Sequence, residues 1–175
     1  LMPAGSPITD MSSMFTSKSS FNDPDISLWD VSTVTNMRVM LQGTAFNHDL
    51  SSWDVSNVTD MYNMFGSTTA FNQDISSWDV SSVTAMNGMF YAATSYNNGG
   101  ATFVGSNFVD TMNNVTRMND MFIGCTNFNV DISTFNTSSV TNMYRMFENA
   151  TSFNQDIGSW DTSSVTGTAQ GTGMF

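Results

Sequence analysis

Aspartates recur at one place in a repeated phrase, directly after a tryptophan. Ca²⁺ prefers carboxylate, carbonyl and water oxygens as ligands, so Asp54 and Asp79 are predicted as a metal site. A second interpretation is that these carboxylates accept hydrogen bonds from the following turn, as Asx-turn residues do. A third is direct contact with a ligand, because strand alternation would place them on the outer side. The aspartate column consists of Asp30, Asp54, Asp79 and Asp161, with Asn136 in the same place.

The repetition of these carboxylates argues against an enzyme. Acid–base catalysis by two carboxylates needs surroundings that push their pKa values apart, and a nucleophile needs a base within reach. Each aspartate of the column has nearly the same sequence neighbours as the next, whereas a catalytic residue must differ from its copies. The lone His48 has no repeated histidine partner. We therefore expect no catalytic activity and, calcium apart, no cofactor.

The aspartates belong to a repeat that runs through the chain. The phrase FNQDISSWDVSSVTAMNGMF at 71–90 returns as FNHDLSSWDVSNVTDMYNMF at 46–65 and, more changed, at 128–147. From Val34 onward, its Val-Thr step recurs at intervals of 24, 25, 32, 25 and 25 residues. Periods of about 20 to 50 residues are typical of solenoids, propellers and arrays, and this one is too short for a propeller blade. The sequence predicts a single repeat-array domain over 1–175, as a segment of a longer protein.

Apolar residues within one copy predict where its strand and turn lie. Ile75, Trp78 and Val80 have the L-x-x-L-x-L spacing of a leucine-rich-repeat strand. Met86 and Phe90, with a further Met between them, have the i, i+3, i+4 spacing of a short helical or 3₁₀ turn. The Phe, Trp and Met columns are expected to form the core, because each coil of a repeat protein buries its apolar side against its neighbours.

The repeat resembles that of a known family. Ser-Val-Thr-Asn-Met-Tyr-Arg-Met-Phe-Glu-Asn-Ala at 139–150 and Phe-Asn-Gln-Asp-Ile-Gly-Ser-Trp-Asp at 153–161 are similar to the unit of BspA-like leucine-rich repeats, known from mycoplasma and listeria lipoproteins. The resemblance implies a leucine-rich-repeat-like right-handed solenoid of about seven turns, with one short parallel strand and a short helical or 3₁₀ turn per coil. It also implies display outside the cell, for adhesion or recognition.

Two further columns, of aspartate and of asparagine, are typical of turns. Asn and Asp side chains satisfy backbone groups in turns, so Phe-Asn-x-Asp predicts a turn into each strand and a stacked asparagine ladder. The columns are Asp25, Asp49, Asp74, Asp131 and Asp156, preceded by Asn47, Asn72, Asn129 and Asn154.

A threonine column raises a different possibility. A flat, regular threonine face would suit ice or mineral binding, whereas threonine hydroxyls can also bond neighbouring strands. The column consists of Thr9, Thr35, Thr59, Thr84, Thr116, Thr141 and Thr166.

The repeat is interrupted by an insertion at 97–106, which contains three Gly. Binding insertions of repeat proteins commonly lie on one edge. We therefore expect a flexible protrusion in which Phe103, with Phe108 close by, contacts a ligand; neutral loop growth is the alternative. Four sequons would carry N-glycans if the source glycosylates secreted proteins, and they lie at Asn57, Asn114, Asn136 and Asn149.

Charge and composition narrow the class of partner. Four Lys and Arg against fifteen Asp and Glu give a net charge of −11, which repels phosphate backbones and anionic lipids. No stretch is long and apolar enough to insert in a membrane. Cys125 is the one cysteine, so a disulfide framework within the chain is excluded.

The sequence thus favours an extracellular or cell-surface repeat protein that mediates adhesion to, or recognition of, a protein or glycan partner. Nucleic acid is not expected as a partner. The first alternative is a structural spacer or filament subunit with no ligand of its own, with possible self-assembly and calcium stabilisation. The second is ice or mineral surface binding.

Overall fold

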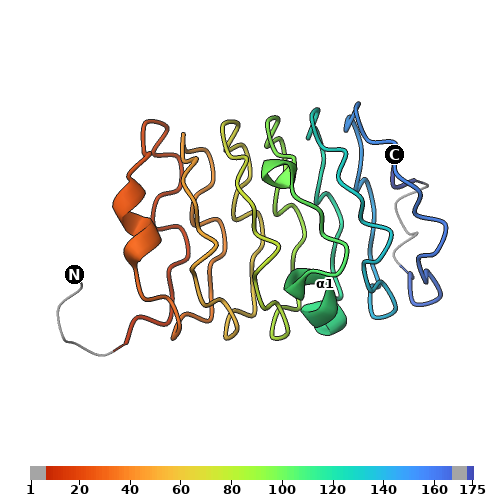
Figure 1. Cartoon of the computed structure of the whole chain (residues 1–175), viewed down its shortest axis with the longest axis horizontal. Helices are drawn as coiled ribbons and strands as arrows, with labels where there is room; N and C mark the ends of the chain where they lie inside the picture. The colour runs from red at the N-terminus through yellow and green to blue at the C-terminus, as the bar shows by residue number, and fades with distance from the viewer. Residues whose placement is uncertain (1–6, 167–172) are drawn as a thin grey trace.

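The computed structural model describes residues 7–166 and 173–175. The repeats lie side by side along the long axis of the molecule, in chain order from the red end to the blue end (Figure 1). Helical elements are few and short: η1 (Pro24–Leu28), η2 (Asn98–Gly100), α1 (Asn107–Thr111) and η3 (Met112–Asn114). Among the described residues, no helix is long and apolar enough to span a membrane.

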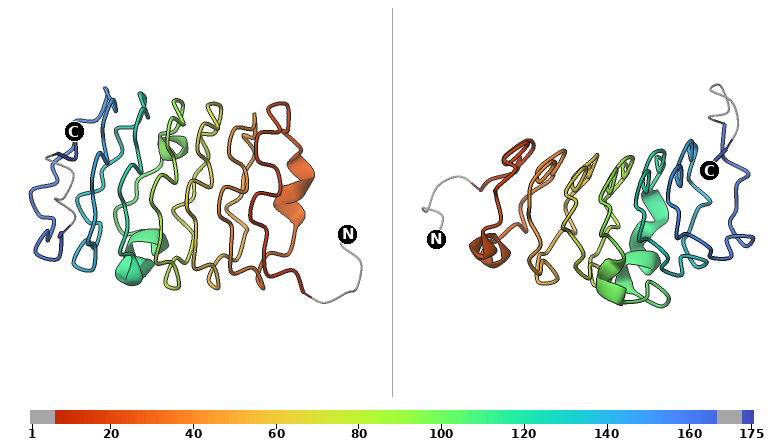
Figure 2. Two further views of the ribbon diagram at one scale, coloured as in Figure 1. Left: turned by 180° about the vertical axis from the view of Figure 1, so that it is seen from behind. Right: turned by 90° about the horizontal axis from the view of Figure 1, so that it is seen from above.

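Neighbouring repeats are joined without β-strands. Over 7–166 and 173–175 the structure has no strand, and the only bridges between repeats are isolated parallel ones. Both views of Figure 2 show the repeats as irregular loops with α1 on the outside of the row. The predicted leucine-rich-repeat solenoid, with a short parallel strand and a short helical turn in each coil, is therefore wrong. The bridges join Asp10 to Asn36, Asn36 to Asp60, Asp60 to Ala85, Ala85 to Arg117 and Arg117 to Asn142.

In the predicted strand, the N–H groups of Ser76, Trp78 and Ser81 donate to Asp74, Ile75 and Asp79 in local turns, so no ladder to the next repeat forms. The predicted helical turn falls in the methionine segment of each repeat, the stretch that begins at the first Met of Met-x-x-Met (11–17, 37–43, 61–67, 86–92, 118–124 and 143–149). The N–H of Met61 donates to the carbonyl of Ala85 in the next repeat at 3.0 Å, and that of Asn63 donates likewise to Asn87 at 3.1 Å. The N–H of Met64 instead donates to the carbonyl of Met61, three residues back, at 3.2 Å. Donors thus alternate between the neighbouring repeat and a local turn, so neither a strand nor a helix forms.

Two residues in each methionine segment have left-handed backbone conformation. Asn63 has φ 50° and Ser67 has φ 56°, and these angles bend the chain after each bond to the next repeat. Non-glycine residues adopt this region at a cost of roughly 1 to 2 kcal/mol, so the inter-repeat bonds must offset local strain. The pairs are Ser13 and Ser17, Val39 and Gly43, Asn63 and Ser67, Gly88 and Ala92, Asp120 and Gly124, and Arg145 and Asn149.

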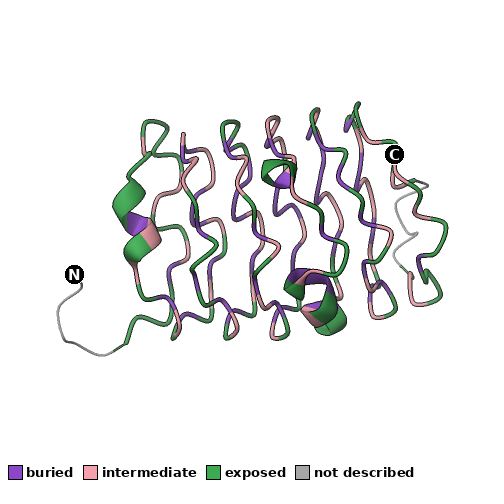
Figure 3. Ribbon diagram, in the orientation of Figure 1, coloured by how far each residue is buried: buried purple, intermediate pink, exposed green. Residues whose placement is uncertain are grey.

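The core runs along the row, as Figure 3 shows by the buried segments in successive loops. The rings of Phe65, Phe90 and Phe122 stack from repeat to repeat, with centroids 5.6 and 5.7 Å apart and planes 3° apart. The indole Nε1 of Trp78 donates to the carbonyl of Leu50 in the preceding repeat at 3.0 Å. The predicted Phe, Trp and Met core is confirmed by the buried residues of these columns.

Cys125 also lies in this core. Its thiol donates to the carbonyl of Phe90 at 2.9 Å, and burial raises the pKa of the thiol to about 12. The residue is fully buried, so it has the packing role of a small apolar side chain.

Candidate functional site

The aspartate column caps local turns. Oδ1 of Asp54 accepts bonds from the N–H of Ser56 at 3.1 Å and from its hydroxyl at 2.6 Å. Asp30 is bonded in the same way by Ser32, at 3.0 and 2.6 Å. The N–H groups of Ser81 and Ser163 donate to Asp79 and Asp161, both at 2.9 Å. Asn136 accepts the same pair of bonds from Ser138. The Asx-turn interpretation of this column is confirmed.

These bonds favour the charged carboxylate. The hydroxyl of Ser56, followed by its N–H, lowers the pKa of Asp54 below its ordinary value, against a smaller opposing effect of burial. The same causes lower the pKa of Asp30 and Asp161.

The structure does not support a metal site at Asp54 and Asp79. Among residues 7–166 and 173–175, no three His, Cys, Asp or Glu side chains lie close enough to hold an ion together. Carboxylates held in separate Asx turns, one to a repeat, supply too few oxygens for the six to eight ligands, roughly, that Ca²⁺ takes. Calcium binding therefore stays a prediction with no geometry in its favour.

The predicted asparagine ladder is confirmed. Oδ1 of Asn72 accepts the N–H of Asn97 at 2.8 Å and that of Gly99 at 3.0 Å. In turn, the N–H of Asn72 donates to Oδ1 of Asn47 at 2.9 Å. The ladder joins each repeat to the next through Asn22, Asn47, Asn72, Asn97, Asn129 and Asn154.

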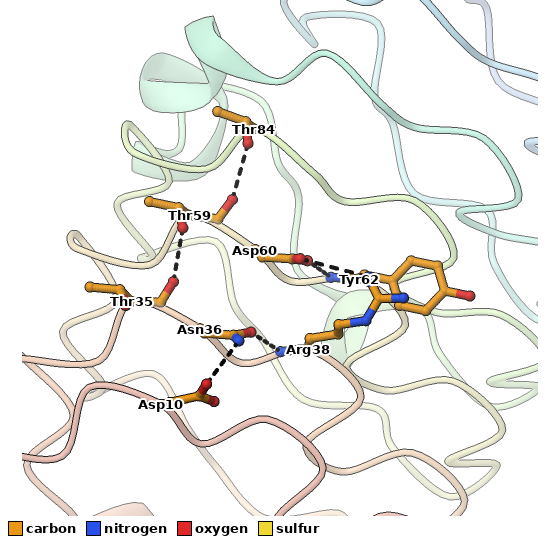
Figure 4. A network of polar contacts seen from close by, with 8 residues as sticks. All are labelled: Asp10, Thr35, Asn36, Arg38, Thr59, Asp60, Tyr62 and Thr84. Atoms are coloured by element: carbon orange, nitrogen blue, oxygen red, sulfur yellow. Dashed lines mark hydrogen bonds and ion pairs between the residues drawn. The ribbon is translucent and has the colours of Figure 1, made fainter.

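Threonine hydroxyls form a second ladder, shown in Figure 4 for Thr35, Thr59 and Thr84. The hydroxyl of Thr59 donates to the carbonyl of Thr35 at 3.0 Å, and that of Thr84 donates to the carbonyl of Thr59 at 3.3 Å. The N–H groups of the same residues donate to the same carbonyls. Because the hydroxyl protons of five residues in this column are used inside the protein, this face offers a surface lattice of ice or mineral little free donor capacity. The five are Thr35, Thr59, Thr84, Thr116 and Thr141.

The insertion is attached to the repeat before it. The buried side chain of Asn98 accepts the N–H of Ile75 at 3.0 Å, and the N–H of Phe108 in α1 donates to the carbonyl of Ser76 at 3.0 Å. Phe103 and Phe108 are 1% and 0% exposed, with ring centroids 5.0 Å apart. The rings that were predicted to contact a ligand are therefore core residues that leave no surface for one.

Three of the four sequon asparagines have amide groups that bond within the fold. Nδ2 of Asn57 donates to the carbonyl of Ser32 at 2.8 Å, and Nδ2 of Asn114 donates to that of Ser81 at 2.7 Å. Asn136 donates to a neighbouring Asn side chain at 2.7 Å. Since glycosylation uses this nitrogen, exposed Asn149, in left-handed conformation, is the most accessible of the four.

A hollow of about 270 Å³ lies over the methionine segments. Two glycines explain its position. Gly88 occupies the place where the neighbouring repeats carry Asn63 and Asp120, and Gly66 occupies the place of Gln42 and Tyr91. The hollow is lined by Gln42, Tyr62, Asn63, Ser67, Gly88, Tyr91, Asp120 and Arg145. We call this site the Gly88 hollow.

Asn63 forms the floor of the Gly88 hollow. A β-carbon on Gly66 would overlap Oδ1 of Asn63, and one on Gly88 would lie 3.5 Å from it. Gly66 thus makes room for the Asn63 carboxamide, whereas Gly88 leaves the space beside it free of a side chain. Its Oδ1 is buried and has no hydrogen-bond partner among the described residues, although buried polar atoms in proteins are nearly always bonded.

Ion pairs fix the rim. Oδ1 of Asp120 accepts Arg145 Nε at 3.0 Å and Nη2 at 2.8 Å, and the Asp120 carboxylate raises the pKa of Arg145 above its ordinary value. Cζ of Arg38 lies 3.9 Å over the ring of Tyr62, with Asp60 close to the guanidinium, as Figure 4 shows. Glu148 lies 3.6 Å from Arg145 Nε as a second carboxylate partner. These contacts hold the charged side chains in place and leave the rim without excess positive charge.

Comparison with protein families places the whole row in one group. The model of the family described as "Mycoplasma protein of unknown function, DUF285" matches residues 9–113 and again 109–175. The chain belongs to this family. The first DUF285 match contains the floor of the Gly88 hollow, and the second contains its Asp120–Arg145 rim. No curated protein and no solved structure matches the chain.

Proposed function

We propose that the chain is a non-catalytic recognition module that binds a protein or glycan partner at the outer surface of a cell. The observation that carries the proposal is a difference between the polar side chains that repeat in register and those that do not. Those repeated in register bond to the protein itself, whereas the different side chains of the methionine segments gather around one hollow. Concave sites with a few convergent polar groups are the usual place of ligand binding.

The resemblance of the repeat to BspA-like surface proteins supports the cell-surface location. A net charge of −11 also disfavours nucleic acid and anionic lipid as partners. Tyrosine and arginine, which line the Gly88 hollow, are enriched in recognition surfaces.

The proposal is tested by surface plasmon resonance of the purified chain on immobilised mammalian glycoproteins, with and without enzymatic removal of their glycans. Saturable binding to at least one of the two surfaces is expected. The chain after thermal unfolding is the control for non-specific adsorption. If the folded chain binds neither surface above that control, the recognition proposal is wrong.

A structural spacer or filament subunit is the second candidate, favoured by the uniform asparagine and threonine ladders. Such ladders add bonds between neighbours at every repeat and suit a rod that carries load. Sedimentation over a wide range of protein concentration distinguishes a filament subunit, which forms larger species as concentration rises, from a recognition module that stays the same size.

A further inference from the structure

We propose that the Gly88 hollow binds a single neutral hexose unit of a glycan. The inference rests on the proposed function and names its ligand class. The hollow of about 270 Å³ lies just below the range of about 300 to 1,000 Å³ that holds drug-sized ligands, so it suits one sugar ring and not an extended chain. A protein partner would use a larger contact, of about 800 Å² on each side.

The floor of the hollow is closed. Oδ1 of Asn63 is buried, so a ligand atom does not reach it, and a β-carbon on Gly66 would overlap this oxygen. The polar contacts to a ligand must therefore come from the walls and the rim of the hollow.

The walls of the hollow suit the apolar face of a sugar ring. Tyr91 is 41% exposed although it lies against the hollow, which makes it one of the few large, exposed side chains among the described residues. Arg38 covers Tyr62, at 3.9 Å from the ring centroid. Tyr91 is therefore the aromatic side chain with more area left for a ligand, and its hydroxyl provides a polar edge.

The rim favours an uncharged ligand with several hydroxyls. Asp120 and Arg145 neutralise each other through contacts of 2.8 and 3.0 Å, and Glu148 lies 3.6 Å from Arg145 Nε, so the rim offers no free positive charge to an anion. Arg145 keeps hydrogen-bonding capacity, because a guanidinium donates five bonds, whereas Asp120 also accepts Nδ2 of Asn119 at 2.7 Å. Gln42 and Ser67 add donors and acceptors on the other side. The guanidinium of Arg145, together with Gln42 and Ser67, can therefore bond neighbouring hydroxyl groups of a sugar.

The test is an NMR titration of the ¹⁵N-labelled chain with the methyl glycosides of glucose, galactose, mannose and N-acetylglucosamine, and with N-acetylneuraminic acid as the anionic probe. At least one neutral glycoside is expected to shift the amide signals of Gly88 and Tyr91 with a saturable curve. Gly88→Asn fills the hollow and is expected to weaken that binding by about tenfold or more. Tyr91→Ala is expected to weaken it as well.

Gly43→Asn is the matched control. Gly43 has φ +68°, close to the +65° of Gly88, and a β-carbon there meets Ser17 at an ordinary 3.6 Å. The substitution therefore carries the same backbone cost outside the hollow, and binding is expected to stay unchanged. Asparagine suits both sites because Asn63 already has left-handed conformation in this chain. Melting temperatures of the two variants show whether each is folded.

Three results would overturn the hexose proposal: no response to any neutral glycoside, a response only to N-acetylneuraminic acid, or equal binding by wild type and Gly88→Asn. If the wild-type chain still binds immobilised glycoproteins in those cases, the recognition function stands and only the ligand class is wrong. Failure to bind both the glycosides and the glycoproteins overturns both proposals.

Discussion

Asp54 and Ser56 show how the repeated polar residues are used. One carboxylate oxygen accepts two bonds from a serine two residues later, and the same arrangement recurs at Asp30 and Ser32. A side chain engaged in this way fixes its own turn and has less capacity for an outside partner. Polar residues that repeat in register therefore stabilise the fold. The candidate site lies where the repeat pattern changes, as at Gly88.

The bond between Ser56 and Asp54 predicts a pH effect. Because the Asp54 pKa is lowered in the folded chain, the bond contributes stability at pH above the unfolded pKa of about 3.9 and loses it as pH falls through the folded pKa. Ser56→Ala is expected to raise the Asp54 pKa toward its unfolded value and to shrink this acid dependence. NMR titration of the Asp54 carboxyl measures the shift. An unchanged pKa would show that the serine hydroxyl does not hold the charge.

The element that defines the fold is the methionine segment, with its two left-handed residues. Val39 has φ 49° although it is β-branched, whereas Gly88 meets the same requirement without a side chain. Left-handed conformation is costly for most residues and least so for glycine and asparagine. The strain in each segment therefore depends on which type of residue occupies the left-handed position.

Gly88→Val is expected to lower the free energy of unfolding by about 1 to 2 kcal/mol, the cost of left-handed conformation at a residue with a side chain. Gly88→Asn should cost less, and Val39→Gly should raise the free energy of unfolding. Denaturant unfolding of the three variants gives the comparison. If Gly88→Val is as stable as wild type, left-handed conformation is not required at this position.

The sequence predicts the core and the ladders better than the backbone. The Phe columns and the asparagine ladder follow from period and residue type, since stacked repeats bring equal positions together. The spacing of Ile75, Trp78 and Val80 wrongly predicts a strand, because Asx turns take backbone donors of this stretch. Val39 and Ala92 give no local signal of the left-handed conformation found in the methionine segments. The Gly88 hollow depends on side chains from several repeats and on a missing one. Its sole trace in the sequence is glycine where the neighbouring repeats have larger residues.

At the scale of the whole molecule, two hydrogen-bond ladders and stacked aromatic columns tie each repeat to its neighbours. Stability of such a row is the sum of repeats and their interfaces. These contacts are all made by the chain itself.

Calcium is accordingly expected to leave the melting temperature unchanged. An ion that binds only the folded chain, at a free concentration of about a hundred times its Kd, would raise the free energy of unfolding by about 2.7 kcal/mol. Thermal melting in millimolar Ca²⁺ and in a chelator makes the comparison, with Mg²⁺ as the control for ionic strength. A higher melting temperature in Ca²⁺ that the chelator reverses would show that the aspartate column binds the ion after all.

The central claim is that the repeated columns hold the fold and the Gly88 hollow binds the partner. The most direct test compares glycoprotein binding by a variant with Asp30, Asp54, Asp79 and Asp161 all changed to Asn, and by Gly88→Asn, in salt that screens surface charge. Asn136 already makes the same turn bonds in this column, so the first variant should fold. The account predicts normal binding by the aspartate variant and weak binding by Gly88→Asn. Loss of binding in the aspartate variant, with binding intact in Gly88→Asn, would contradict it.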